Sequence, residues 1–272
     1  MDHPSDATLA RVQELLAAEY AEQRSKEWLD LRENMITASD VASAIGENHY
    51  ETPDAFIKKK VLKVVWAGNA ATEHGTKLEP LVRDLYDART GRKSHEIGLV
   101  QHRTYPWLGA SPDGVTEDGL LIEIKCPLTR KIEAKVPKHY LPQVQLQLEI
   151  TDLEECDFIQ YRPASTEGTV PVRPEEFVVV RVKRDREWFA KHLPAMKAAW
   201  DRICAGRASG LCDIQEDLVP FDPQFKNEIE CLVVEEDGDV YSPAKDVDLQ
   251  GVQGGLLCEV HSTGGTPVPQ VA

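Results

Sequence analysis

The sequence has 272 residues, of which 42% are hydrophobic and 28% charged, and its formal net charge is −15. This composition is typical of a globular protein and excludes global disorder, collagen and coiled coil. It is also unlike proteins that coat nucleic acid, which are usually basic. No uncharged apolar stretch approaches the roughly 20 residues of a membrane span, and residues 1–10 do not resemble a signal peptide, so we expect a cytoplasmic protein.

The acidic residues are concentrated toward the C-terminal end. Residues 205–272 contain 13 acidic and 3 basic residues, whereas residues 1–204 contain 33 and 28. A local basic groove in the first 204 residues is therefore compatible with the net charge. We predict an N-terminal helix in residues 1–23, a main domain in residues 24–204 and a partly irregular acidic extension in residues 205–272.

Apolar periodicity and helix-end signals predict the elements in chain order. Thr37 followed by Asp40 is typical of a helix start, and Gly46 and Gly91 are helix stops. Helices are expected over residues 9–24, 26–32, 53–65, 75–90, 140–151 and 186–205. A further short helix is expected to start near residues 37–39 and to end at residue 46. Strands are expected over residues 97–101, 108–110, 120–126, 156–161 and 176–183, with weaker signals at 231–234 and 256–260, and a frayed end from residue 251. This order predicts an α/β or α+β fold with a mixed central sheet flanked by helices.

Glu123 and Lys125 lie two residues apart in the strand expected over residues 120–126. Because a strand alternates its faces, both project from one face, and the apolar Ile124 projects from the other. Asp113 lies at a turn ten residues before Glu123. Two carboxylates converging from neighbouring strands suit Mg²⁺ or Mn²⁺, and a lysine beside them can orient or deprotonate a water for phosphodiester hydrolysis. By pattern alone, a surface ion pair on an edge strand also explains Glu123 and Lys125.

Further motifs surround this pair. They are Leu31-Arg32, Ile36-Thr37-Ala38-Ser39, His74-Gly75 followed by Glu79, Ser111-Pro112-Asp113-Gly114, Glu123-Ile124-Lys125-Cys126-Pro127 and Tyr140-x-x-Gln143-Val144-Gln145. In this order and at these spacings, they resemble the lambda-exonuclease-like, YqaJ-type viral recombinase family, a branch of the PD-(D/E)xK nucleases. The resemblance covers residues 24–204 and not the tail, and it implies a restriction-endonuclease-like core.

The resemblance also implies a metal site. Asp113 and Glu123 would bind Mg²⁺, which Mn²⁺ can replace, with help from the backbone carbonyl of Ile124. Lys125 would position the attacking water, Glu79 would reach a second metal, and Gln143 would support the nucleophile region. The family has one more Asp before the Ser-Pro-Asp motif, where this chain has Arg103. A second metal site would therefore lack one acid.

Arg32, Ser39 and Ser111 match the residues with which the family grips the 5′-terminal phosphate of DNA. The helix start expected near residues 37–39 would add exposed N–H groups that bind phosphate. Basic residues at 58–60, 63, 130, 131, 135 and 138 are candidates for contacts to the DNA backbone. Trp28 and Trp66 are expected in the core.

Several of these residues have structural alternatives. Glu79 can complete a capping box with Thr76, Gln143 and Gln145 can be solvated helix residues, and Arg32 can be a surface arginine.

For the whole chain the resemblance implies a metal-dependent 5′→3′ exonuclease that acts on double-stranded DNA ends. Its 3′ overhangs would serve a single-strand-annealing recombinase, and the enzyme would form a ring-shaped homotrimer of phage or viral origin, with no membrane partner. Two alternatives stay open: a catalytically silent DNA-end-binding module and an endonuclease of the same superfamily. The intact set of Asp113, Glu123 and Lys125 weighs against the first.

Overall fold

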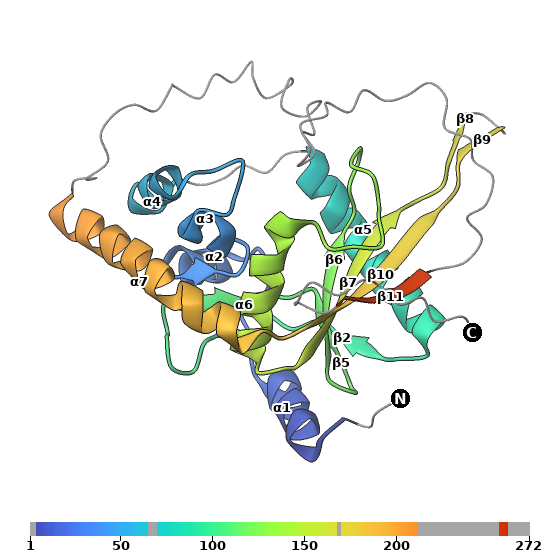
Figure 1. Cartoon of the computed structure of the whole chain (residues 1–272), viewed down its shortest axis with the longest axis horizontal. Helices are drawn as coiled ribbons and strands as arrows, with labels where there is room; N and C mark the ends of the chain where they lie inside the picture. Colours follow the sequence, from blue (N-terminus) through green and yellow to red (C-terminus); the bar gives the residue numbers. More distant parts are fainter. Residues whose placement is uncertain (1–3, 65–69, 168–169, 211–255, 261–272) are drawn as a thin grey trace.

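The computed structural model describes residues 4–64, 70–167, 170–210 and 256–260 (Figure 1). Its centre is a mixed sheet, which in these residues has six strands in the order β11-β10-β7-β6-β5-β2. β6 and β7 are parallel, whereas β7 and β10 are antiparallel. The strands are β2 (Ser94–His95), β5 (Gly114–Thr116), β6 (Leu120–Lys125), β7 (Glu155–Arg162), β10 (Glu176–Lys183) and β11 (Leu256–Val260). The predicted mixed α/β architecture is confirmed.

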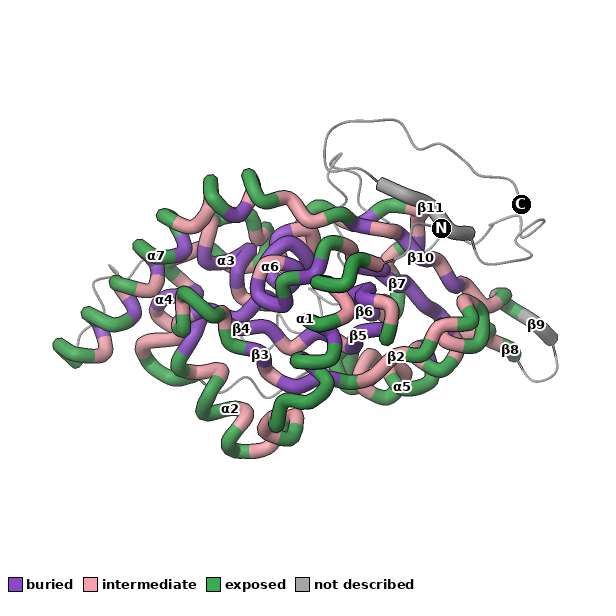
Figure 2. Tube along the Cα trace, turned by 90° about the horizontal axis from the view of Figure 1, so that it is seen from below, coloured by how far each residue is buried: buried purple, intermediate pink, exposed green. Residues whose placement is uncertain are grey.

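Helices cover both faces of this sheet. On one face lies α5 (Ala70–Thr90), whose Val82 and Tyr86 belong to one apolar cluster with Ile122 and Ile124 of β6. On the other face lies α6 (Leu141–Thr151), which packs against α3 (Val41–Ile45) and α7 (Arg186–Ser209) (Figure 1). Burial is correspondingly high in β6, β7 and α6 (Figure 2). A charged side chain on β6 is therefore held inside the protein.

A smaller sheet with the order β1-β4-β3 brings the N-terminal part of the chain to the main sheet. Its strands are β1 (Ile36–Thr37), β3 (Val100–Gln101) and β4 (Leu108–Ala110). Thr37 pairs with Gly109, so the segment that follows β1 runs beside the segment that leads to Asp113. A Cβ at Gly109 would lie 2.1 Å from Met35 Sδ, so any larger residue at this position would force the buried Met35 side chain to move.

The other described elements lie around these layers. They are α1 (Asp6–Ala17), α2 (Lys26–Glu33), α4 (Pro53–Val61), the 3₁₀ turn η1 (Lys138–Tyr140) and the hairpin of β8 (Ser165–Glu167) and β9 (Val170–Arg173). None of the described helices is both long and apolar enough to cross a membrane.

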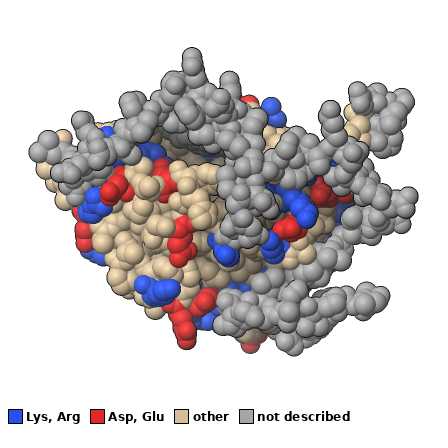
Figure 3. Space-filling model, turned by 45° about the horizontal axis from the view of Figure 1, so that its top comes forward, with Lys and Arg blue, Asp and Glu red and all other residues tan. Residues whose placement is uncertain are grey.

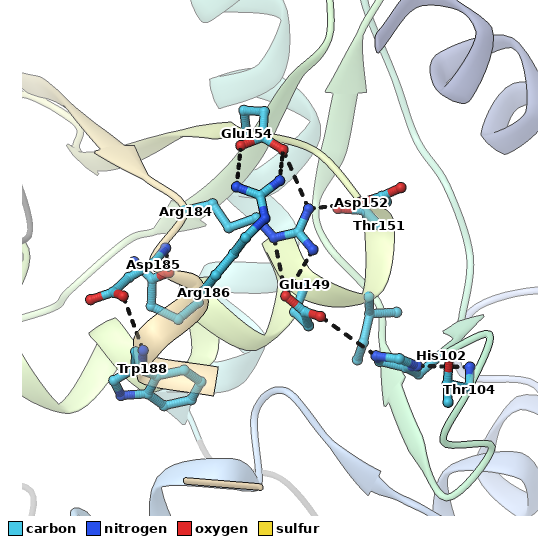
Figure 4. A network of polar contacts seen from close by, with 12 residues as sticks. His102, Thr104, Glu149, Thr151, Asp152, Glu154, Arg184, Asp185, Arg186 and Trp188 are labelled. Carbon is cyan, nitrogen blue, oxygen red and sulfur yellow. Dashed lines mark hydrogen bonds and ion pairs between the residues drawn. The ribbon is translucent and has the colours of Figure 1, made fainter. Parts of the chain in front are cut away.

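An ionic network ties the end of α6 to the connection between β10 and α7 (Figure 4). Arg184 donates hydrogen bonds to Glu149 at 2.8 Å and to Asp152 at 2.7 Å. Arg186 binds both carboxylate oxygens of Glu154. Asp185 caps α7 by accepting a hydrogen bond from Trp188 N. The network fixes α6 along the sheet from its C-terminal end.

Most predicted elements are present, but several helix ends differ from the prediction. α1 begins at Asp6, because Ser5 caps it, and ends at Ala17 rather than at residue 24. α5 begins at Ala70, before the predicted start at residue 75. α7 continues through Gly206 and stops at Gly210, which has a φ of +68°. In the tail, β11 is present, whereas residues 231–234 and most of 251–272 lie outside the described residues.

The helix expected to start at residues 37–39 starts at Val41 instead. Ile36 and Thr37 form β1, and the Asp40 carboxylate accepts hydrogen bonds from Thr37 N at 3.2 Å and Thr37 Oγ1 at 2.8 Å. The Thr37/Asp40 pattern therefore fixes a strand-to-helix turn rather than a helix cap. Gly46 ends the helix as predicted, with a φ of +81°. The predicted helix start at residues 37–39 was therefore wrong, whereas phosphate binding by this segment stays a prediction.

Candidate active site

A cavity of about 480 Å³ is lined by residues of α2, α5, β6 and α6 and of the loops between these elements. Its lining contains every residue to which the resemblance gives a role in metal binding, catalysis or phosphate binding. These residues are Arg32, Ser39, Glu79, Ser111, Asp113, Glu123, Ile124, Lys125 and Gln143. The fold thus brings together residues from distant parts of the sequence, while the role of each stays a prediction.

Glu123 is a buried carboxylate, with 2% of its surface exposed. Lys125 Nζ lies 2.5 Å from Glu123 Oε1, which also accepts a hydrogen bond of 2.7 Å from Gln143 Nε2. Gln147 Nε2 donates to the other oxygen, Oε2, at 2.6 Å. β6 lies between β5 and β7 in the described sheet. The alternative of a surface ion pair on an edge strand is therefore excluded, as is that of a solvated Gln143.

Asp113 lies at the turn before β5 and is held by backbone groups. Its N–H donates to Ile122 O at 3.1 Å, and its Oδ2 accepts a hydrogen bond of 2.6 Å from Ile124 N. Burial, followed by the charges of Glu123 and Glu79, raises the pKa of Asp113 well above its ordinary value. The carboxylates repel one another here, and a cation in the cavity would relieve that repulsion.

Lys125 is a fixed positive charge next to these acids. Burial alone would lower its pKa, but Glu123, Tyr140 and Asp113 more than offset this, so the pKa of Lys125 lies above its ordinary value. Its Nζ also lies 4.9 Å from the centre of the Tyr140 ring, at cation–π distance. Lys125 is therefore protonated and suited to donating hydrogen bonds rather than to accepting a proton.

Glu79 reaches the cavity from α5. Its Oε2 lies 3.7 Å from Arg24 Nη2, and burial raises its pKa against the opposing charge of Arg24. Thr76 lies inside α5, which excludes the capping-box alternative. Arg103, which stands where the family has an acid, pairs with Glu14 and does not line the cavity.

The oxygen ligands in the cavity can be compared with those that the predicted metal ion prefers. Within the described residues, no three His, Cys, Asp or Glu side chains form a complete metal-binding cluster. Asp113 and Glu123 nevertheless supply two carboxylates to one cavity, and burial together with the charge of Glu123 raises the pKa of Asp113. Carboxylate and carbonyl oxygens are the ligands that Mg²⁺ and Mn²⁺ prefer. These residues fit a divalent cation.

The residues predicted to bind phosphate form one wall of the cavity. Arg32 Nη2 donates to Ser39 Oγ at 2.9 Å, and the Arg32 guanidinium stacks 4.4 Å from the centre of the Trp28 ring. Trp28 Nε1 in turn donates to Ser111 Oγ at 3.3 Å. Arg32 is therefore not an isolated surface arginine. Trp28, which the sequence suggested as a core residue, instead lines the cavity and joins Arg32 to Ser111.

Several basic residues considered for DNA contacts are paired within the chain. Lys60 is 12% exposed in its side chain, lies 2.9 Å from the Asp40 carboxylate and donates to Arg32 O at 3.0 Å. Lys131 and Lys135 pair with Glu133. On the face shown in Figure 3, the basic and acidic side chains of the described residues are interspersed. Because Lys60 is bound to Asp40 and to the backbone of Arg32, it stabilises the wall that carries Arg32 and is not free to contact DNA.

Sequence reasoning missed Gln147. The motif drew attention to Gln143 and Gln145, but Gln145 Nε2 donates to Lys183 O at 3.0 Å, away from the cavity. Residues four apart share a helix face, whereas residues two apart do not. This spacing was the signal that could have indicated Gln147 as the partner of Gln143.

The chain is similar to known proteins in sequence and in fold. Residues 27–154 match the family model of the YqaJ-like viral recombinase domain. The chain is also similar to the structure of an alkaline exonuclease, LHK-Exo, from Laribacter hongkongensis. The identity is 29% over 68% of this chain and 95% of that chain, and the TM-score is 0.57.

Two curated proteins extend the comparison. Uncharacterized protein R354 of Acanthamoeba polyphaga mimivirus is 33% identical over 158 residues, which cover 51% of this chain and 29% of that protein. Uncharacterized protein YqaJ of Bacillus subtilis is 25% identical over 203 residues, which cover 71% and 61%. The match thus spans less than two thirds of either relative.

The fold and cavity define an α/β protein with a buried carboxylate–lysine site. Residues 27–154 match the YqaJ-like viral recombinase domain, so the predicted resemblance to this family is confirmed.

Proposed function

We propose that this protein is a metal-dependent nuclease that degrades double-stranded DNA from its ends in the 5′→3′ direction. The observation that carries the proposal is one cavity that contains both the acidic residues and the residues predicted to bind phosphate. These residues are Asp113, Glu123, Lys125, Arg32, Ser39 and Ser111. Similarity to an alkaline exonuclease, which has also been determined in complex with dAMP, supports DNA as the substrate class.

The proposed chemistry divides the cavity into two parts. Asp113 and Glu123 would hold Mg²⁺ or Mn²⁺, with the carbonyl of Ile124 as a further oxygen ligand. A bound divalent ion lowers the pKa of water and offsets negative charge on the phosphodiester. Lys125, which its neighbours keep protonated, would donate a hydrogen bond to the attacking water and so position it.

Arg32 would hold the terminal phosphate. Its guanidinium presents a planar fork of donors, which suits a phosphate with two charge-assisted hydrogen bonds. Ser39 and Ser111 add hydroxyl groups on the same wall. A terminal phosphate carries more charge than an internal diester, so such a wall favours DNA ends.

Removal of nucleotides from 5′ ends would leave 3′ overhangs, on which a single-strand-annealing recombinase could act. The resemblance implies such a partner and a homotrimer, and both belong to this proposal. The molar mass of the full chain by light scattering tests the trimer.

The function is tested with linear duplex that carries 5′ phosphates and a different label on each strand. We expect Mg²⁺-dependent loss of nucleotides from 5′ ends, no reaction in EDTA and no cutting of covalently closed circles. End binding without nucleotide release would identify a silent end-binding module. Cutting of closed circles would identify an endonuclease.

A further inference from the structure

Helix α6 holds both oxygens of the Glu123 carboxylate. Gln143 donates to Oε1 and Gln147 donates to Oε2, at 2.7 Å and 2.6 Å. The two glutamines lie one helical turn apart and therefore present their amides to the same point of β6. Gln147 is 1% exposed and lines the cavity. The orientation of Glu123 is thus set from behind by one helix face.

The two glutamines are not equivalent. Glu123 Oε1 has the charged partner Lys125 at 2.5 Å in addition to Gln143. In the described residues, the hydrogen bond to Oε2 comes from Gln147. A buried polar atom that loses its hydrogen bond is costly, and a carboxylate held at one oxygen can rotate. Gln147 therefore controls the oxygen that Lys125 does not fix.

Gln147 also has an unpaired atom. Its Oε1 is buried and has no hydrogen-bond partner in the part of the chain that the structure describes. Buried amide oxygens are normally paired with protein or water. Gln147 lines the cavity that holds the two carboxylates. A donor such as water in that cavity could therefore supply the hydrogen bond that Gln147 Oε1 lacks.

We propose that Gln147 is a positioning residue of the cation site. By holding Glu123 Oε2, it fixes the carboxylate in the orientation that binds a divalent cation, and its Oε1 accepts a hydrogen bond from water in the cavity. This inference rests on the proposed function, but it concerns a residue outside the motifs that carry the family resemblance.

Gln145 provides a matched control on the same helix. It is 5% exposed, donates to Lys183 O at 3.0 Å and accepts a hydrogen bond from Asp185 N at 2.7 Å. Asp185 belongs to the network of Figure 4, and Gln145 does not line the cavity. The variants Gln147→Met and Gln145→Met therefore remove the same group from the same helix, and only the first removes a contact to Glu123.

The test measures Mn²⁺ binding to the full chain by calorimetry without DNA, alongside the melting temperature. For Gln147→Met we expect Mn²⁺ binding to weaken about tenfold, which corresponds to about 1.4 kcal/mol. For Gln145→Met we expect a lower melting temperature with unchanged Mn²⁺ affinity. If Gln147→Met does not fold, Gln147→Asn keeps the amide but shortens its reach, and the same weakening is expected.

Two results would overturn the inference: wild-type Mn²⁺ affinity in the Gln147 variants, or equal weakening in the Gln145 variant. Equal weakening would mean that α6 acts through general stability alone. A wild-type chain that neither binds Mn²⁺ nor hydrolyses DNA would instead refute the proposed function, and this is visible before any variant is made.

Discussion

Lys125 Nζ lies 2.5 Å from Glu123 Oε1, and both side chains project from the same face of β6. At a protein surface such a pair would contribute little to stability, because water screens it. Here Glu123 is almost fully buried, so loss of one partner leaves an uncompensated charge, at a cost of about 3–5 kcal/mol. The pair therefore links the stability of β6 to the chemistry proposed for the cavity.

Replacing Lys125 should separate catalysis from binding. If its charge positions the attacking water, Lys125→Ala should lower the hydrolysis rate by at least about 10²-fold. DNA binding measured with Ca²⁺ in place of Mg²⁺ should stay close to that of the wild type. The exposed Lys197, which pairs with Asp201 and is not among the candidates for DNA contacts, supplies the control variant Lys197→Ala. Equal losses of binding and rate would assign Lys125 to phosphate capture.

Replacing the carboxylates should abolish metal-dependent hydrolysis. Asp113→Ala and Glu123→Ala should each lose at least about 10³-fold in rate, because without the ion nothing lowers the pKa of the attacking water. Asp201→Ala, which removes an exposed carboxylate paired with Lys197, should leave the rate unchanged. Undiminished hydrolysis by the wild type in excess EDTA would contradict the metal requirement.

The sequence was sufficient to locate the cavity, because its key residues occur in short motifs. Strand alternation places Glu123 and Lys125 on one face, and the turn before β5 brings Asp113 beside them. The resemblance added Arg32 and Glu79, which no local pattern connects to β6. All of these residues line the cavity.

The features that the sequence did not predict depend on tertiary packing. Trp28 donates a hydrogen bond to Ser111, which lies 83 positions further along the sequence, and no periodicity indicates such a contact. The predicted start of α3 was wrong because Thr37 lies in β1 and pairs with Gly109 of β4, and pairing between strands overrides a local helix-start pattern. The role of Gln147 follows from a helix face that becomes defined only once α6 packs on β6.

Arg32 should control recognition of the DNA end. A hydrogen bond to a charged group contributes about 1.5–3 kcal/mol, so 5′-phosphorylated duplex should be degraded about ten- to a hundredfold faster than 5′-hydroxyl duplex. Arg32→Ala should reduce this preference, and Arg32→Lys should restore it only in part, because lysine lacks the planar fork. Arg186→Ala, an exposed arginine paired with Glu154, should keep the full preference. Equal wild-type rates on both substrates would contradict the role of Arg32.

The buried network below the α5 face of the sheet should matter for stability rather than for catalysis. Tyr86 Oη donates to Asp157 Oδ2 at 2.6 Å, and Arg181 binds the same carboxylate. Tyr86→Phe should lower the free energy of unfolding by about 1–3 kcal/mol, because it removes a hydrogen bond to a buried charge. Asp157→Ala should cost about 3–5 kcal/mol, because it leaves Arg181 without this partner. Urea unfolding measures both, and a variant as stable as the wild type would contradict the prediction.

Asp40 should make the wall that carries Arg32 sensitive to acid. Burial raises the pKa of Asp40, but the charges of Lys60 and Arg32 outweigh burial and hold the pKa below its ordinary value of 3.8. A depressed pKa in the folded state contributes stability above the unfolded value, and this contribution is lost as the pH falls through the folded pKa. Each tenfold difference in proton affinity between the folded and unfolded states corresponds to about 1.4 kcal/mol.

The stability advantage of the wild type over Asp40→Asn should therefore be full at pH 7. It should shrink once the pH falls below about 4, as Asp40 takes up its proton and the ion pair with Lys60 is lost. Urea unfolding at pH 7, 5, 4 and 3.5 measures this difference. Asp30→Asn removes an exposed carboxylate paired with Lys26 and should change the unfolding free energy little at any of these values, because water screens the pair. A constant difference between the wild type and Asp40→Asn across the series would mean that Asp40 acts through its hydrogen bonds to Thr37 and not through its charge.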